Sequence, residues 1–160
     1  MSMDERWLNR SPGEMLATFP WFRGEGFELI VQDLLVLPQD PPVLVEGFRL
    51  LPTLMAPLLS HPRQAVWLIP SAEFRLDAFT ERGTLRDIAR KTSNPDRALA
   101  NLLARDAMFS ERLASEASAL DLEVIEVDLG DGVEELTQRV GRTLGLAGPG
   151  ISPSMARPSG

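Results

Sequence analysis

Apolar positions along this chain of 160 residues follow a helical spacing in some stretches and form short continuous runs in others. Over residues 28–37, for example, Ile30, Leu34 and Leu37 recur three to four positions apart, which is typical of one face of a helix. The same spacing predicts a long helix from 95 to about 120. The full set of predicted helices is 1–20, 28–37, 50–59, 72–81, 84–91, 95–120 and 133–144.

Three short runs have the character of strands instead. Residues 43–45 and 65–69 are continuous and apolar after a turn, as in strands buried on both faces of a parallel sheet. Residues 122–127 alternate Leu-Glu-Val-Ile-Glu-Val. Strands that alternate with helices predict an α/β fold: a three-layer domain with a parallel sheet between helices.

Capping residues support several of these boundaries. Ser11-Pro12-Gly13-Glu14 has the Ser, the first-turn Pro and the later Glu of a helix start. Ser71 is expected to cap the helix over 72–81, and Asn94 the helix that begins at Pro95. The chain is therefore expected to form one domain over 1–146, with a helical N-terminal segment over 1–27 and a disordered tail rich in Pro, Gly and Ser over 147–160.

Composition and charge narrow the classes of partner. The net charge of −7 opposes a broad nucleic-acid surface, because phosphate backbones require clustered Lys and Arg. There is no cysteine, which excludes disulfides and thiol catalysis. No signal peptide and no apolar stretch of spanning length is evident, so a cytoplasmic protein without a membrane partner is expected.

In a parallel α/β sheet, ligands bind beyond the carboxyl ends of the strands. Glu46 and Gly47 directly follow the predicted strand 43–45, and Asp128 follows 122–127. Glu46 could bind Mg²⁺ or accept a proton from a hydroxyl group, and Gly47 would let a substrate approach the backbone. The alternative is that Glu46 caps a helix or pairs with an arginine. Asp128 could equally be a cap.

A locally basic segment runs from Arg75 to Arg112 and contains eight basic and six acidic residues in an otherwise acidic chain. Arg86 and Arg90 are four positions apart and share a helix face. Arginine binds phosphate oxygens in a bidentate manner. The alternative is a solvated helical surface with internal ion pairs. His61 is expected in a surface turn, and Trp67 in the core.

The order of these elements resembles the small-molecule and nucleotide kinases of the P-loop fold, in particular those with a strand that ends in Glu-Gly, as in uridine kinases. The resemblance covers roughly residues 28–146. The positions that carry it are Leu44-Val45-Glu46-Gly47, Leu51-Pro52, Ala65 to Ile69, Arg105-Asp106 and Val124 to Asp128.

The resemblance implies an ATP-dependent transfer of phosphate to a small hydroxyl-bearing metabolite or nucleoside. ATP and Mg²⁺ would be cofactors, and Glu46 would lie near substrate and metal. Arg82, Arg86 and Arg90 would belong to a lid over the phosphates. Arg105 would follow the lid, and the loop beginning at Asp128 would lie near the adenine.

One departure from that family is large. Its members open with a strand and the loop G-x-x-x-x-G-K-[ST], and this sequence contains no such motif; its only lysine is Lys91. In the family that first strand lies between the strands that match 43–45 and 65–69. We therefore expect a reading frame that continues upstream of Met1, a sheet closed differently, or a partner that fills the gap. As it stands, the chain is expected to be truncated or inactive.

Two other functions compete with the phosphotransferase. The first is a non-catalytic binding domain that keeps a kinase-like scaffold and pairs with itself as a homodimer, or with a partner, through an exposed sheet edge. The second is an unrelated α/β hydrolase, which the sequence supports poorly because it lacks G-x-S-x-G.

Overall fold

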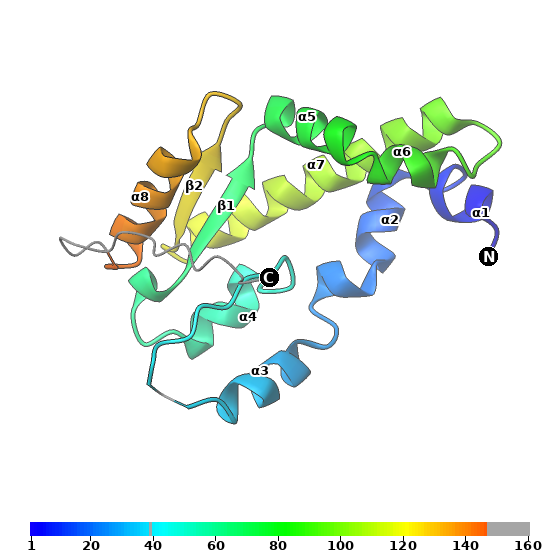
Figure 1. The fold of residues 1–160 in the computed structure, drawn as a ribbon. Coiled ribbons are helices and arrows are strands. Elements are labelled where there is room, and N and C mark those ends of the chain that lie inside the picture. Colours follow the sequence, from blue (N-terminus) through cyan, green and yellow to red (C-terminus); the bar gives the residue numbers. More distant parts are fainter. Residues whose placement is uncertain (39, 147–160) are drawn as a thin grey trace, which may run out of the picture.

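The computed structural model describes residues 1–38 and 40–146 (Figure 1). The predicted disordered tail over 147–160 lies outside the described residues. The helices are α1 (Met3–Trp7), α2 (Pro12–Thr18), α3 (Phe27–Leu35), α4 (Pro52–Met55), α5 (Ala72–Arg82), α6 (Thr84–Ala89), α7 (Pro95–Ala119) and α8 (Val133–Thr143). Short 3₁₀ turns are η1 (Pro20–Arg23), η2 (Ala56–Leu58) and η3 (Pro62–Gln64). The strands are β1 (Val66–Pro70) and β2 (Glu123–Val127).

The sheet of the described chain has two parallel strands, in a fold that is mixed α/β and mostly helical. Val66 is opposite Glu123, and Pro70 is opposite Val127. Parallel neighbours need a crossover connection, and here α5, α6 and the long helix α7 supply it. The predicted α/β class is confirmed at this level. The described residues do not form the larger three-layer parallel sheet.

The prediction of a buried strand at 43–45 is wrong. Val43, Leu44 and Val45 lie in irregular, exposed backbone, and the side chain of Leu44 is 78% exposed. A strand needs a neighbour that pairs with its main chain, and none of the described residues provides one here. Pro41 and Pro42, just before the run, have no N–H to donate to a ladder.

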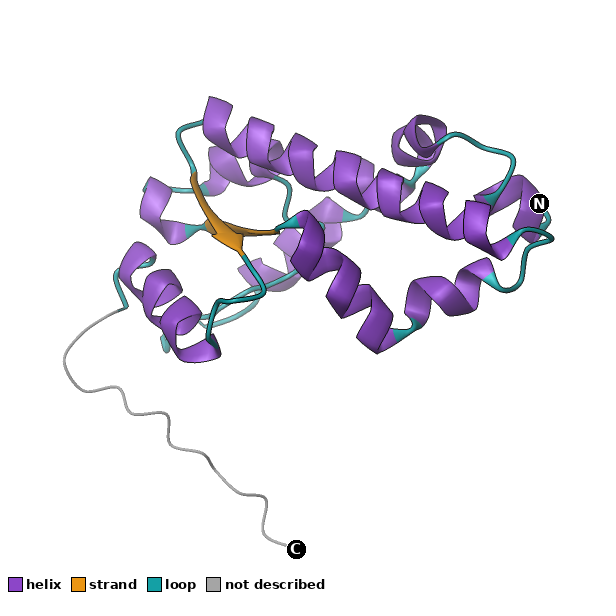
Figure 2. Ribbon diagram, turned by 90° about the horizontal axis from the view of Figure 1, so that it is seen from above, coloured by secondary structure: helices purple, strands orange, loops and turns teal. Residues whose placement is uncertain are grey.

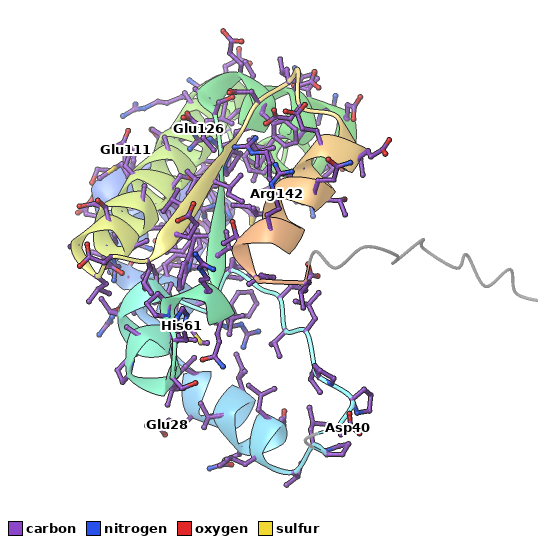
Figure 3. The ribbon with its side chains drawn as sticks, turned by 90° about the vertical axis from the view of Figure 1, so that its left-hand side faces the viewer. Glu28, Asp40, His61, Glu111, Glu126 and Arg142 are labelled. Atoms are coloured by element: carbon purple, nitrogen blue, oxygen red, sulfur yellow. The ribbon has the colours of Figure 1, made fainter. Side chains whose placement is uncertain are left out.

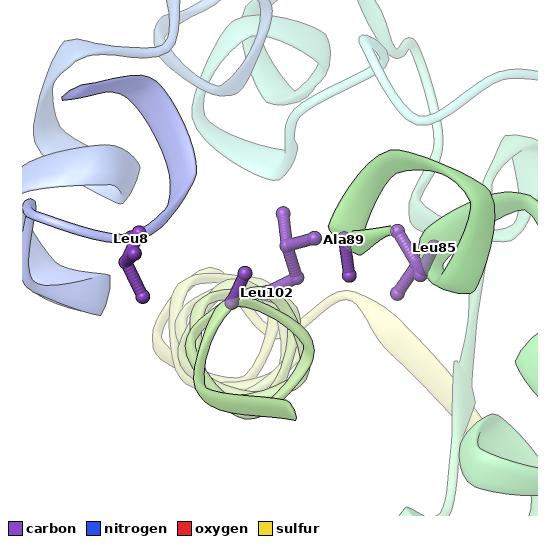
Figure 4. Packing of buried hydrophobic residues seen from close by; sticks show 5 residues of the cluster. Leu8, Leu85, Ala89 and Leu102 are labelled. Carbon is purple, nitrogen blue, oxygen red and sulfur yellow. The ribbon is translucent and has the colours of Figure 1, made fainter. Parts of the chain in front are cut away.

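Helix α7 forms the central axis of the molecule and crosses most of its length (Figure 2). It contributes to three apolar clusters along its length. In the first, Leu8 packs from one side of α7, and Leu85 and Ala89 of α6 pack from the other (Figure 4). Leu102, with no exposed surface, lies between them. The second cluster stacks Phe22 on Phe109, with ring centroids 3.9 Å apart.

The first 23 residues are tied to α7 by polar contacts as well as by packing. The Asn101 amide donates to the carbonyls of Trp7 and Leu8, at 3.4 and 3.2 Å. Nearer the C-terminal end of α7, Arg112 donates to the carbonyl of Phe22 at 3.1 Å. At its N-terminal end, the Ser93 amide donates to Asp4 at 2.8 Å. These contacts fix the path of the N-terminal segment along the helix.

Strand β1 exposes one edge of its main chain. The Ser71 amide donates to the Val127 carbonyl at 2.9 Å, so in a parallel ladder Ile69 and Trp67 also direct their main-chain groups toward β2. Leu68 and Val66 therefore direct theirs toward the opposite edge, where no described strand pairs with them. The Leu68 side chain is 45% exposed. Within the described residues, this edge of β1 is therefore free.

No helix within the described residues combines the length and apolar character needed to cross a membrane.

Candidate functional site

Glu46 and Gly47 lie in an exposed loop rather than at the end of a strand. No hydrogen bond or ion pair to the Glu46 carboxylate is found within the described residues. Gly47 has a φ of 152°, and nothing lies within 4 Å of the position that a Cβ would occupy. The loop therefore leaves both residues open to solvent and to a ligand.

A hollow of about 200 Å³ adjoins this loop. It lies between Ile30 of α3 and the segment 45–50, and its lining is mostly apolar. The neighbouring Arg49 has its guanidinium 4.6 Å from the centroid of the Trp21 ring. The hollow is smaller than the roughly 300–1,000 Å³ of most small-molecule sites.

Asp131, which the sequence analysis did not single out, organises the turn at Asp128 after β2. The Asp128 amide donates to the Asp131 carboxylate at 2.9 Å, and Arg139 of α8 is 3.3 Å from the same carboxylate. Arg139 also donates to the carbonyl of Glu126 at 3.2 Å. The spacing Asp128-x-x-Asp131 before a helix is the signal that could have identified this turn. Asp128 itself remains exposed.

Across the sheet, the Ser71 hydroxyl accepts from the Phe74 amide at 3.3 Å, so its predicted role as a cap of α5 is confirmed. Asn94 likewise caps α7. His61 lies in an exposed turn and Trp67 is buried, both as expected. Trp67 donates its indole N–H to the Leu50 carbonyl at 2.9 Å, which ties the end of the 43–50 segment to β1.

The predicted lid arginines lie on exposed helix surfaces. Arg82 ends α5, Arg86 is in α6, and Arg90 directly follows α6. Arg90 is 3.6 Å from Asp87, a pair in which both side chains are largely exposed and which therefore adds little stability. Arg86 lies within α6, whereas Arg90 is the residue that caps its C-terminal end. No described contact joins any of the three to Glu46.

Arg105 has a different environment from the other arginines, because its side chain is only 8% exposed. Its guanidinium is 2.6 Å from the Asp106 carboxylate. It also lies 5.5, 5.7 and 5.4 Å from the ring centroids of Trp7, Phe19 and Phe22. Each of these distances is within the range of a cation–π contact. The arrangement satisfies Arg105 internally, inside the packing between α7 and the N-terminal segment.

The described residues do not fit ATP and Mg²⁺ by themselves. They contain no group of three His, Cys, Asp or Glu side chains placed to hold a metal ion. The hollow beside Glu46 is mostly apolar and small, and its lining includes Arg49 but none of Arg82, Arg86 and Arg90. A second hollow, of about 310 Å³, lies at the opposite ends of the strands and includes none of the predicted site residues. Its lining is Pro62, Arg63, Asp121, Glu123, Arg142 and Thr143.

Comparison of the chain with protein-family models, with curated proteins and with solved structures found no match.

Proposed function

We propose that this chain is an incomplete α/β scaffold that functions after a further strand pairs with the free edge of β1. The observation that supports this most directly is the outward-facing main chain of Val66 and Leu68. Unpaired strand edges readily accept another strand. The edge carries no charged side chain to discourage pairing, and Pro70, which has no N–H to donate, limits the available donors of β1 on this edge to Val66 and Leu68.

The exposed residues Val43, Leu44 and Val45 support the same proposal. They have the composition of a buried strand but no partner among the described residues. One inserted strand would give them a neighbour, and it would also pair with the main chain of Val66 and Leu68. Residues 43–45 and the free edge of β1 would both lack a pairing partner for one reason. The strand that belongs between them would not be part of these 160 residues.

In the first form of this proposal, the added strand carries a phosphate-binding loop, and the completed domain is a phosphotransferase. This form draws on the resemblance to P-loop kinases, in which the loop-bearing strand occupies that central place. Glu46 would then act on the substrate side, and Arg82, Arg86 and Arg90 would be recruited by movement of α5 and α6. The 160 residues alone are expected to show no turnover of ATP, because their sequence lacks the G-x-x-x-x-G-K-[ST] loop that positions its phosphates.

The genomic DNA upstream of the Met1 codon provides the first test. A strand-like segment followed by G-x-x-x-x-G-K-[ST] in frame would support the phosphotransferase. The longer protein should then hydrolyse or transfer phosphate from ATP, and Glu46→Gln should lower kcat, whereas Glu123→Gln on β2 should not. Absence of the motif, or robust ATP turnover by the 160 residues alone, would contradict this form.

In the second form, the added strand belongs to a binding partner or to a second copy of the chain, and no catalysis follows. The observation that favours it is the separation of the candidate groups: Glu46 has no charged partner among the described residues, Arg90 pairs with Asp87, and Arg105 is buried. Light scattering of the purified chain distinguishes the possibilities. A dimer that Leu68→Lys converts to a monomer supports self-pairing, since a charge on an edge strand opposes association.

A further inference from the structure

His61 is the single histidine of the sequence, and its imidazole closes a turn instead of remaining free in solvent. The Nδ1 atom of His61 accepts a hydrogen bond from the Arg63 amide at 3.1 Å. Pro62, between them, has no N–H, so the Arg63 amide is the first donor of η3. No carbonyl among the described residues accepts from this amide. The imidazole therefore has the role that Ser or Asn usually has at the start of a helix.

A second side chain holds the other side of the same turn. The Oε1 atom of Gln64 accepts from the Ser60 amide at 2.8 Å, the Ser60 hydroxyl at 2.9 Å and the His61 amide at 3.1 Å. Histidine is the residue type that ordinarily changes charge near neutral pH, whereas a glutamine amide does not titrate. The turn η3 is thus held by one side chain of each kind.

Protonation changes what the His61 ring can do at Nδ1. Neutral imidazole has one nitrogen that donates and one that accepts, whereas both nitrogens of imidazolium carry a proton and only donate. The bond from the Arg63 amide requires Nδ1 as the acceptor, so it exists only with the neutral ring. With the protonated ring, two donors would face each other across the same distance.

The charged groups around the turn have no predominant sign. Two acids and two arginines line the hollow of about 310 Å³ beside η3, namely Asp121, Glu123, Arg63 and Arg142. Figure 3 views this side of the molecule, with Arg142 on α8 and His61 at the turn beneath it. No ion pair joins His61 to a carboxylate within the described residues. These charges therefore do not offset the loss of the bond to Arg63.

The position of η3 gives its opening a structural consequence. Ala65 follows the turn, and β1 begins at the next residue, Val66. The Gln64 amide donates to the His61 carbonyl at 3.0 Å, and the Ala65 amide donates to the Pro62 carbonyl at 3.4 Å. These bonds fix the path by which the chain reaches β1, and the turn also forms one wall of the hollow.

We propose that His61 is a pH-sensitive cap, which in its neutral form closes the turn η3 before β1 and on protonation opens it. Opening releases the Arg63 amide and loosens the chain ahead of Val66, while Gln64 keeps its bonds to Ser60. This device belongs to the chain by itself, so it holds or fails independently of the proposed strand pairing at β1.

Thermal melting at about pH 8 and about pH 5.5 tests the cap, because these values bracket the ordinary titration of histidine. His61→Asn keeps an acceptor that does not titrate, and Asn is among the best cap residues. Between the higher and the lower pH, the melting temperature of wild type should fall by about 2–4 °C relative to that of His61→Asn. Both proteins share the α-amino group, so its titration cancels in the comparison.

Two further variants serve as controls. His61→Ala removes the acceptor at every pH, so its melting temperature should lie below that of His61→Asn by a similar amount at both pH values. Ser71→Ala removes the cap of α5, whose hydroxyl does not titrate. The melting temperature of Ser71→Ala should therefore lie equally far below that of wild type at both pH values. Circular dichroism establishes that each variant is folded.

Nuclear magnetic resonance of the wild type observes the turn directly. The Arg63 amide proton should move upfield as its hydrogen bond is lost, with the same pH midpoint as the ring protons of His61, and the Ser60 amide should change less. Three results would overturn the proposal. They are a difference between wild type and His61→Asn that does not depend on pH, equal melting of His61→Ala and His61→Asn, and an Arg63 amide that moves no more than that of Ser60.

Discussion

The guanidinium of Arg105 lies 5.5 Å from the centroid of the Trp7 ring, which joins the middle of α7 to the first helix of the chain. The same guanidinium pairs with Asp106 at 2.6 Å. A buried charge such as the Arg105 guanidinium stabilises the fold only while the groups that it pairs with remain in place. This contact therefore explains how an arginine that resembles a phosphate ligand in sequence can instead hold the N-terminal segment against α7.

We predict that Arg105→Ala lowers the free energy of unfolding by about 3 kcal/mol, because it leaves Asp106 without its partner and removes contacts with Trp7, Phe19 and Phe22. Urea unfolding followed by circular dichroism measures this. Arg97→Ala, at an exposed position in the first turn of α7, should change the value by less than about 0.5 kcal/mol. Equal, small effects of both substitutions would mean that Arg105 does not hold the two segments together.

Leu102 provides a second test of the same packing, because it is fully buried in the cluster formed by α1, α6 and α7. Leu102→Ala should cost about 2–5 kcal/mol, through lost burial and a residual cavity. Leu29→Ala makes the same chemical change at an exposed position on α3 and should cost less than about 0.5 kcal/mol. A large destabilisation in Leu29→Ala would show that α3 is packed more deeply than the structure indicates.

The elements that were predicted correctly are those whose local chemistry determines them. Ser11, Ser71 and Asn94 cap the helices expected to follow them. The strand prediction at 65–69 was right to within one residue because that segment finds β2 as a partner. These features depend on neighbours close in sequence or on a single pairing.

The prediction at 43–45 failed because a strand is defined by its partner and not by its own residues. An apolar, β-branched run has the same composition whether or not a neighbour is present. The roles suggested for Glu46, Gly47, Arg82, Arg86, Arg90, Arg105 and Asp128 remain predictions. Burial of Arg105 could not be read from sequence, since it depends on aromatic side chains that are distant along the chain.

The exposed run at 43–45 makes a prediction of its own. Leu44→Ser should leave the free energy of unfolding within about 0.5 kcal/mol of the wild-type value, because the side chain is already in solvent. It should also reduce any self-association seen by light scattering, since an exposed apolar patch becomes smaller. Destabilisation by more than about 1 kcal/mol would instead indicate that Leu44 is buried in solution.

Asp4 is expected to make stability depend on pH in the acidic range. Hydrogen bonds from Ser93, first of the side chain and then of the backbone, hold the pKa of Asp4 below its ordinary value of 3.8. Because the pKa of Asp4 is lower in the folded state, the ionised carboxylate stabilises the fold. This contribution to the free energy of unfolding is complete above pH 3.8 and is lost as the pH falls through the lowered pKa.

Unfolding of wild type and Asp4→Asn should be compared at about pH 6 and about pH 2.5. At the higher pH the wild type should be more stable than Asp4→Asn. The difference in free energy of unfolding between the two proteins should be smaller at the lower pH. A difference between the two proteins that does not change with pH would contradict a role for the ionised carboxylate.

The central claim is that β1 leaves one edge free for another strand, and amide hydrogen exchange at neighbouring residues of β1 tests it directly. The Ile69 amide faces β2 and should exchange slowly, whereas the Leu68 amide faces the unpaired edge and should exchange far faster in the monomeric chain. When a partner strand binds, the Leu68 amide should become protected while Ile69 changes little. Equal, strong protection of Leu68 and Ile69 in the monomer would contradict the claim.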